Sequence, residues 1–379
     1  MFKSSFTLSD LLDCYPTLNS PQVSRRALLA VGSLMAVGIQ GCGSGSDSPS
    51  GTGGNSGSGP EVTTLAGSSS GFQDGTGAGA KFSVPRAITA DSGGNVYVAD
   101  MFNNRIRMIT AAGVVTTLAG SSTSGSADGT GANAQFDFPQ AIAWDGSGSL
   151  YVADTSNHLI RKVVISTGVV TTLAGSTQGS TDGTGIAAQF HTPCGIAVDS
   201  NGDVYVGDTG NHRIRKITSV GVVTTLAGST QGATDGVGTA AEFYMPRGLC
   251  VSGSDLYVAD SSNQRIRKID VLTGTVTTLA GSTQGATDGV GTAATFSGPT
   301  GLVVDQSGDL YVADSNNHLI RKVVVSTGVV TTLAGSTQGA TDGAGTAAKF
   351  STPYCIATDG TGHLYVADSG NHRIRKITL

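Results

Sequence analysis

One hexapeptide, Val-Thr-Thr-Leu-Ala-Gly, constrains the fold of this chain more than any other feature. It occurs six times, starting at Val62, Val115, Val170, Val223, Val276 and Val330, so successive copies lie 53 to 55 residues apart. Self-similarity at such a period indicates a repeat architecture, in which each repeat is one supersecondary unit packed on its neighbours. The length of 379 residues therefore does not imply two or three average domains.

One repeat can be followed from residue 296 to residue 335. Residues 299–304, 309–314 and 316–325 are short segments rich in β-branched and aromatic residues, and residues 328–335 contain the hexapeptide. Gly, Asn, Asp and Ser separate the segments, as is typical of turns between strands. No stretch of ten residues has the 3.6-residue period of an amphipathic helix. The repeat therefore predicts four antiparallel strands.

The number of repeats predicts how the chain closes. Six sets of first-to-third strands begin near Ala87, Ala141, Gly195, Gly248, Gly301 and Cys355. The last set has no fourth strand after it, whereas the first hexapeptide, at residues 62–67, has no strands before it. We therefore predict an all-β, six-bladed β-propeller with four antiparallel strands per blade, closed by an N-terminal outer strand in the last blade.

Two units, residues 195–217 and 355–377, resemble NHL repeats, which are named after an Asn-His-Leu signature. Asn157-His158-Leu159 and Asn317-His318-Leu319 spell that signature. The resemblance covers residues 62–379 and implies a six-bladed propeller. The functions it implies are diverse: protein and RNA binding, extracellular sensing and, in some members, metal-dependent lyase activity.

The first 41 residues are typical of a bacterial export signal. Ser24-Arg25-Arg26 resembles a twin-arginine motif, and the apolar run at residues 27–39 is too short to span a membrane. The run ends in Ile39-Gln40-Gly41-Cys42, which resembles a lipobox and predicts cleavage before a lipidated Cys42. A plain signal peptide is the alternative. We expect localisation to the bacterial cell envelope, anchored by lipid on the periplasmic or outer face.

The remaining chain divides into a linker, residues 42–60, and the propeller, residues 61–379. The linker is almost entirely Gly, Ser, Thr, Asn and Pro, a composition that favours a flexible tether. The net charge of −5 argues against a nucleic-acid partner. We expect a monomer that meets the membrane through its lipid anchor only. Cys194, Cys250 and Cys355 occupy different repeat positions and predict no disulfide framework.

Residues present in every repeat are predicted to be structural. An Asp ends each second strand: Asp100, Asp154, Asp208, Asp260, Asp314 and Asp368. An Arg lies in each third strand: Arg107, Arg161, Arg215, Arg267, Arg321 and Arg375. We expect each Asp to cap its turn and to pair with a nearby Arg. A Phe in each long connection is expected to anchor it: Phe82, Phe136, Phe190, Phe243, Phe296 and Phe350.

Two other repeated features invite a metal or phosphate interpretation that the sequence does not support. His158, His212, His318 and His372 share a turn position with Asn104 and Gln264, so hydrogen bonding suffices there. The Asp-Gly-x-Gly loops, such as the one at Asp74, lack the further oxygen ligands of a calcium loop. We interpret them as turns after the outer strand, and we predict no metal and no cofactor.

Functional residues are expected where the repeats differ. The residues just after the repeated Pro are unlike one another: Arg86, Gln140, Cys194, Arg247, Thr300 and Tyr354. So are those two before it: Ser83, Asp137, His191, Tyr244, Ser297 and Ser351. In a propeller this connection lies at one mouth of the central channel. The candidate ligand-binding residues are Arg86, Asp137, Gln140, His191, Tyr244, Arg247 and Tyr354.

The sequence thus predicts a lipoprotein propeller that binds a protein, peptide or glycan at one channel mouth without catalysis. An alternative is a metal-dependent lyase or lactonase that uses Asp137, His191, Tyr244 and Arg247. Against it, a hydrolytic zinc site normally has three protein ligands, and this mouth offers a single His. A second alternative is a structural envelope protein without a specific ligand.

Overall fold

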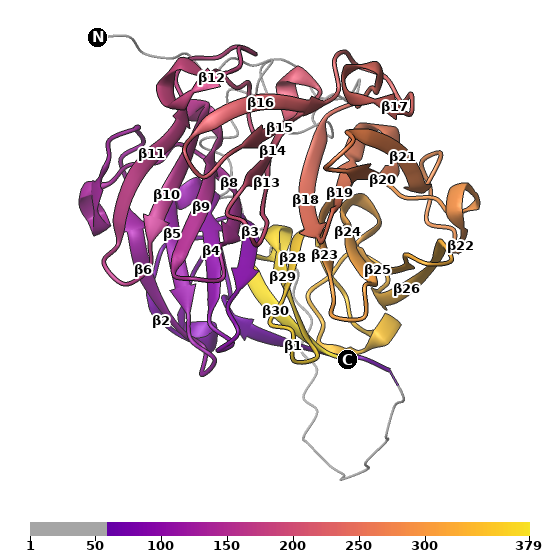
Figure 1. Cartoon of the computed structure of the whole chain (residues 1–379). Helices are drawn as coiled ribbons and strands as arrows, with labels where there is room; N and C mark the ends of the chain where they lie inside the picture. The colour runs from indigo at the N-terminus through magenta and orange to yellow at the C-terminus, as the bar shows by residue number, and fades with distance from the viewer. Residues whose placement is uncertain (1–58) are drawn as a thin grey trace, which may run out of the picture. The chain divides into compact units, whose positions relative to one another are not determined.

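The computed structural model describes residues 59–379, which form six antiparallel sheets arranged as the blades of a propeller (Figure 1). The predicted signal peptide, Cys42 and nearly all of the predicted linker lie outside the described residues. Each inner strand contacts the inner strands of two neighbouring blades, and the last contacts the first, so the ring is closed. The prediction of an all-β, six-bladed propeller is confirmed.

Four main strands build each blade, as predicted, and we number the blades by their inner strands. The inner strands are β3 (Pro85–Ala90), β8 (Pro139–Trp144), β13 (Gly195–Val198), β18 (Pro246–Ser252), β23 (Pro299–Val304) and β28 (Pro353–Thr358). The second strands are β4 (Val96–Asp100), β9 (Ser149–Asp154), β14 (Val204–Asp208), β19 (Asp255–Asp260), β24 (Leu310–Asp314) and β29 (His363–Asp368). The third strands are β5 (Arg105–Ile109), β10 (Leu159–Val164), β15 (Arg213–Ile217), β20 (Arg265–Asp270), β25 (Leu319–Val324) and β30 (Arg373–Thr378). The outer strands are β6 (Val114–Gly120), β11 (Val169–Gly175), β16 (Val222–Ala227), β21 (Thr275–Ala280), β26 (Val329–Gly335) and, for blade 6, β1 (Glu61–Ala66).

A fifth, two-residue strand completes each sheet, which the sequence did not predict. These strands are β2 (Gly75–Thr76), β7 (Gly129–Thr130), β12 (Gly183–Thr184), β17 (Gly236–Val237), β22 (Gly289–Val290) and β27 (Gly343–Ala344). Each comes from the Asp-Gly-x-Gly loop that follows one outer strand, and it pairs with the outer strand of the next blade. The loop is therefore a bridge between blades, and it covers an edge that would otherwise be unpaired.

The predicted closure is confirmed. Strand β1 pairs antiparallel with β30, with Glu61 opposite Thr378 and Val62 opposite Ile377. Figure 1 shows β1, from the start of the described chain, lying beside β30 at its end. Blade 6 thus takes its outer strand from one end of the described chain and its other main strands from the opposite end.

The hydrophobic core lies between the blades. Six clusters of buried side chains each combine residues of two neighbouring blades; one contains Phe82 and Val98 of blade 1 with Tyr365 and Ala367 of blade 6. All six repeated Phe side chains are fully buried in such clusters, which confirms their predicted anchoring role. A single four-stranded sheet cannot cover its own two faces, so ring closure is what buries them.

The structure also explains why the hexapeptide repeats so faithfully. The β1–β30 register shifts between Thr64 and Ala66, so Leu65 is a bulged residue, and it packs against the adjoining core cluster. Gly67, with φ of +94°, approaches the backbone of His372 so closely that a Cβ atom would clash with the carbonyl oxygen. Only glycine tolerates both the positive φ and the close approach to the carbonyl oxygen at this position.

The described helical elements are single 3₁₀ turns of three residues, such as Thr209–Asn211 after β14. Within residues 59–379, no helix has the length and apolar character needed to cross a membrane.

Candidate ligand site at one channel mouth

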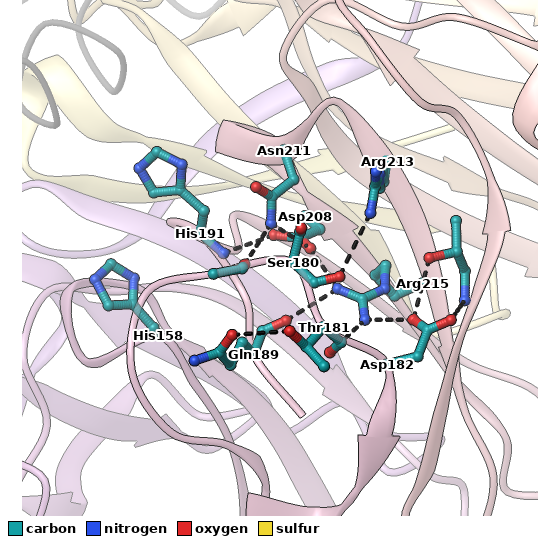
Figure 2. Close-up of polar contacts among 12 residues, drawn as sticks. His158, Ser180, Thr181, Asp182, Gln189, His191, Asp208, Asn211, Arg213 and Arg215 are labelled. Carbon is teal, nitrogen blue, oxygen red and sulfur yellow. Dashed lines mark hydrogen bonds and ion pairs between the residues drawn. The ribbon is translucent and has the colours of Figure 1, made fainter. Parts of the chain in front are cut away.

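A buried ion-pair network fixes the loops that lead into the channel. In blade 3, Arg215 donates from Nη1 to Asp208 at 2.7 Å and from Nη2 to Asp182 at 2.6 Å (Figure 2). Asp208 also accepts a hydrogen bond of 2.7 Å from the backbone N–H of His191, in the loop before β13. The equivalent Arg–Asp pair is present and fully buried in every blade. The predicted pairing of Asp with Arg is confirmed. The predicted turn cap is wrong: Asp208 makes no side-chain cap bond to the 3₁₀ turn that follows it, because its oxygens accept from Arg215, from the Asn211 side chain and from the loop before β13 instead.

The buried carboxyl groups of the network lie beside donors that favour their ionised form. Burial raises the pKa of Asp208, while Arg215, Asn211 and the backbone N–H of His191 oppose that rise. In blade 1, burial likewise raises the pKa of Asp100, to about 6, against the opposing bonds from Asn103, Ser83 and Arg107. A carboxyl group with that pKa is mostly ionised at pH 7. In blade 2, burial raises the pKa of Asp154 further, to about 7. Each blade is therefore held by a buried, hydrogen-bonded Arg–Asp cluster.

The repeated His position connects neighbouring blades. Nδ1 of His158 accepts a hydrogen bond from the backbone N–H of Thr192, and Nδ1 of His372 accepts one from Val84. Asn104 and Gln264 do the same through their amide oxygens, which confirms that a hydrogen-bond acceptor suffices. Thr192 has φ of +45° and directly precedes Pro193, which lies just before β13. The hydrogen bond to His158 stabilises this left-handed conformation of Thr192, which sets the direction of the chain just before the inner strand.

The six inner strands enclose a central cavity of about 240 Å³. The residues that follow the repeated Pro all line it: Arg86, Gln140, Cys194, Arg247, Thr300 and Tyr354. Each is 3–5% exposed, so their side chains lie inside the channel. Because all inner strands start at the same end, these six residues form one ring at one mouth, which we call the inner ring.

Three members of the inner ring contact a fourth, Tyr354. The guanidinium carbon of Arg86 stacks 3.7 Å from the centre of the Tyr354 ring. Arg247 donates from Nη1 to the Tyr354 hydroxyl at 2.8 Å, and its guanidinium carbon lies 5.9 Å from the ring centre. Thr300 donates to the backbone oxygen of Tyr354. Side chains of blades 1, 4 and 5 thus converge on Tyr354 of blade 6, those of blades 1 and 4 on its side chain and that of blade 5 on its backbone oxygen.

The other candidate residues lie outside the cavity. Asp137, His191 and Tyr244 are partly exposed and do not line it. The rings of His191 and Tyr244 make edge contacts with His158 and His212 of the preceding blade. Burial raises the pKa of Asp137. The positions before and after the Pro are therefore separated, and only the second set shares a cavity.

Several cavity residues escaped the sequence analysis. Trp144 ends β8 and lines the cavity at the far end of its strand from Gln140. Cys250 and Cys355 also line it; burial raises the pKa of both thiols, that of Cys355 to about 11. These thiols are therefore protonated and poorly nucleophilic at neutral pH. The available signal was position on an inner strand, because consecutive residues along each inner strand, and not only the first, line the cavity.

The side chains give no support to the metal-dependent alternative. In the described part of the chain, no three His, Cys, Asp or Glu residues gather closely enough to hold a metal ion. His191 forms a hydrogen bond with Gln178, and Asp137 and Tyr244 belong to other blades. The arrangement supports binding by hydrogen bonds and charge.

Comparisons with known proteins agree with this architecture. The family model "NHL repeat" matches residues 190–217, 243–269, 296–323 and 350–377. NHL repeat-containing protein 2 of Homo sapiens is 31% identical over 338 residues, which cover 78% of this chain and 46% of that protein. Protein SUPPRESSOR OF QUENCHING 1, chloroplastic, of Arabidopsis thaliana is 34% identical over 281 residues, covering 66% and 26% of the two chains. The chain thus spans less than half the length of these two relatives.

The structure also resembles solved propellers. An auxiliary nutrient binding protein from Bacteroides thetaiotaomicron superposes with a TM-score of 0.65 at 18% identity, covering 84% of this chain and 76% of that one. At that identity the likeness concerns the fold alone. The matched repeats, the curated relatives and the closed ring of six blades lead to one conclusion: this chain belongs to the NHL-repeat proteins and forms a six-bladed β-propeller.

Proposed function

We propose that the protein is a non-catalytic binding module of the bacterial cell envelope, which takes up part of a protein, peptide or glycan partner at one mouth of its channel. The observation that carries this proposal is the inner ring. Six equivalent positions hold unlike, mostly polar side chains, and all six line one cavity. At equivalent positions elsewhere, such as the Asp–Arg pairs, the blades are identical because the role there is structural.

The cavity limits how much of a partner can enter. Its volume of about 240 Å³ is below the range of about 300–1,000 Å³ usual for drug-sized ligands. A side chain, a chain end or a single sugar unit suits that space, while the rest of the partner stays outside. Concave sites that combine apolar walls with a few fixed polar groups are the usual form of a binding pocket.

The test is to probe peptide and glycan arrays with the labelled protein and then to examine each hit in solution. Trp144 is the only tryptophan of the chain and lines the cavity, so its fluorescence reports on occupancy. A partner that enters the channel is expected to change the emission of Trp144 or its quenching by iodide. Absence of any array hit, or hits that leave both signals unchanged at saturation, would contradict the proposal.

A thermal-shift measurement with EDTA separates this function from the metal-dependent lyase. A binding module without a metal keeps its melting temperature in the chelator. A melting temperature that falls in EDTA and is restored by one divalent metal would favour the lyase.

The location in the envelope is part of the proposal and depends on the sequence of the first 42 residues. Replacement of Cys42 by Ala is expected to move the protein from the membrane fraction to a soluble one, because the acyl anchor is lost. Replacement of Arg25 and Arg26 by Lys is expected to retain it inside the cell. Unchanged fractionation of both variants would contradict the lipoprotein assignment.

A further inference from the structure

We propose that the inner ring is an anion site in which Arg86, Arg247 and Tyr354 recognise a carboxylate group of the ligand. This inference rests on the proposed function, since it names the chemistry of the group that enters the channel. It is carried by the charge of the cavity, by the arrangement of the three side chains and by their burial.

The charge of the cavity is opposite to that of the chain. The protein has a formal net charge of −5. Among residues 59–379, however, those that line the cavity include Arg86 and Arg247 as their charged side chains, and no Asp or Glu. A guanidinium group carries its charge throughout the physiological pH range. The channel mouth is therefore a positive site within a negative protein, and it favours anions over neutral or cationic groups.

The two guanidinium groups are held around one aromatic ring. Arg86 stacks on Tyr354 at 3.7 Å, and Arg247 bonds to its hydroxyl at 2.8 Å. Tyr354 in turn has its backbone oxygen bound by Thr300. The guanidinium donors are thus oriented before a ligand arrives, which reduces the conformational entropy that is lost on binding. Arginine is the residue best suited to this task, because its planar fork matches the two oxygens of a carboxylate.

Burial makes the interaction stronger than it would be on the surface. The three side chains are 4–5% exposed. The rest of the cavity wall is largely apolar, with Ile142, Leu249 and Leu302 on neighbouring inner strands. In such surroundings the effective dielectric constant is low, so attraction between unlike charges is screened less than in water.

The cavity size indicates what carries the carboxylate. About 240 Å³ admits one amino-acid or monosaccharide unit, with the apolar wall facing its carbon skeleton. The carboxylate is the chemistry that an acidic peptide residue and a uronic acid share. The experiment therefore needs one probe from each source, together with its neutral counterpart.

The probes are N-acetyl-glutamate against N-acetyl-glutamine, and glucuronate against glucose, titrated into the full chain by calorimetry. We expect at least one acid to bind more tightly than its neutral counterpart by about tenfold to a hundredfold, as bonds to charged groups suggest. Preference for glutamate indicates a peptide source, and preference for glucuronate a glycan. The affinity should fall as salt is added.

Single substitutions test which side chains produce the preference for the acid over its neutral counterpart. Arg86→Gln and Arg247→Gln are expected to abolish the preference for the acid, whereas Arg213→Gln, in β15 and outside the cavity, should leave it unchanged. Tyr354→Phe removes only the hydroxyl that Arg247 binds and retains the ring under Arg86, so a partial loss is expected. Melting temperatures and circular dichroism confirm that each variant is folded.

The outcomes distinguish this inference from the proposed function. If array ligands change Trp144 fluorescence but bind equally well as acids and as neutral analogues, the carboxylate site is wrong and the binding function stands. Wild-type affinity for the acid in both Arg variants would have the same meaning. If neither the arrays nor the probes yield any binding in the channel, both proposals are overturned.

Discussion

Nδ1 of His372 in blade 6 accepts a hydrogen bond of 3.1 Å from the backbone N–H of Val84 in blade 1. The two residues are 288 positions apart in the chain. They meet because this contact spans the seam where the ring closes, and the same bond recurs at the other seams with His, Asn or Gln as acceptor. Stability of the ring therefore depends on an acceptor nitrogen or oxygen at this position.

The hydrogen bonds that His residues accept between neighbouring blades predict that these contacts lose stability in mild acid. Burial lowers the pKa of His372 and that of His318 below their ordinary value. A His whose pKa is lower in the folded state contributes stability that is complete above the unfolded value of about 6.5 and is lost as the pH falls below it. Protonation of Nδ1 also removes the acceptor. The contribution of these His residues to the urea midpoint should therefore fall between pH 7 and pH 5. It is measured as the difference between the wild type and variants that do not titrate at these positions, because the buried Asp residues, whose pKa values are raised, change stability in the opposite sense.

The chain itself supplies matched variants for this prediction. Asn104 and Gln264 occupy the same position in blades 1 and 4 and do not titrate. His372→Asn and His318→Gln should each reduce the pH dependence while retaining a seam bond at pH 7. Identical pH profiles for wild type and the double variant would contradict this explanation.

The outer strand β1 is predicted to be necessary for the stability of the ring. Val62 and Ala66 are fully buried, and burial of a Val side chain alone contributes about 1.5–3 kcal/mol. A chain that begins at residue 67 should melt at a lower temperature and associate through the exposed edge of β30. A chain that begins at residue 59 is the control, and calorimetry with size-exclusion chromatography provides the measurement. A synthetic peptide of residues 59–67 should restore stability when it is added to the shorter chain. Equal melting temperatures of the two chains would contradict the role of β1 in closing the ring.

The buried Arg of each blade is predicted to be more important than its exposed partner. Arg215→Ala leaves Asp208 fully buried without its ion-pair partner, and loss of one partner of a buried pair costs about 3–5 kcal/mol. Asp182 has a side chain that is 48% exposed, so Asp182→Asn should cost about 1 kcal/mol or less. Urea unfolding measures both free energies. A larger loss of unfolding free energy in Asp182→Asn than in Arg215→Ala would contradict this prediction.

A glycine of the inner strand β13 is predicted to set the spacing of the channel. A Cβ atom at Gly195 would clash with the carbonyl oxygen of Arg247 on the neighbouring inner strand. Gly195→Ala should therefore cost about 1–3 kcal/mol, as overpacking does, and should also displace Arg247 from the inner ring. At Gly79 a Cβ atom meets nothing within 4 Å, so Gly79→Ala should be neutral or slightly stabilising. Equal melting temperatures for Gly195→Ala and Gly79→Ala would show that a Cβ atom at Gly195 does not clash with the carbonyl oxygen of Arg247.

The repeat pattern alone predicted the number of blades, the closing strand, the pairing of the repeated Asp and Arg residues and the anchoring by the repeated Phe residues, but not that each Asp bonds the preceding loop rather than its own turn. Identical residues at a fixed period perform the same local task in every unit, so one unit could be interpreted for all six. The fifth strand was missed for a physical reason: a Gly-Thr pair has no strand signature of its own, and it becomes a strand only because the next blade offers an edge.

Only the tertiary structure decided which polar residues share a cavity. Arg86 contacts Tyr354 because ring closure makes blades 1 and 6 neighbours, and Arg247 reaches the same ring across a blade. His191 lies two residues before Pro193, yet outside the cavity, because Thr192 between them has left-handed backbone that reverses the direction of the chain. Side-chain direction at such a turn, and contacts between distant blades, depend on closure of the whole ring, which no local sequence pattern encodes.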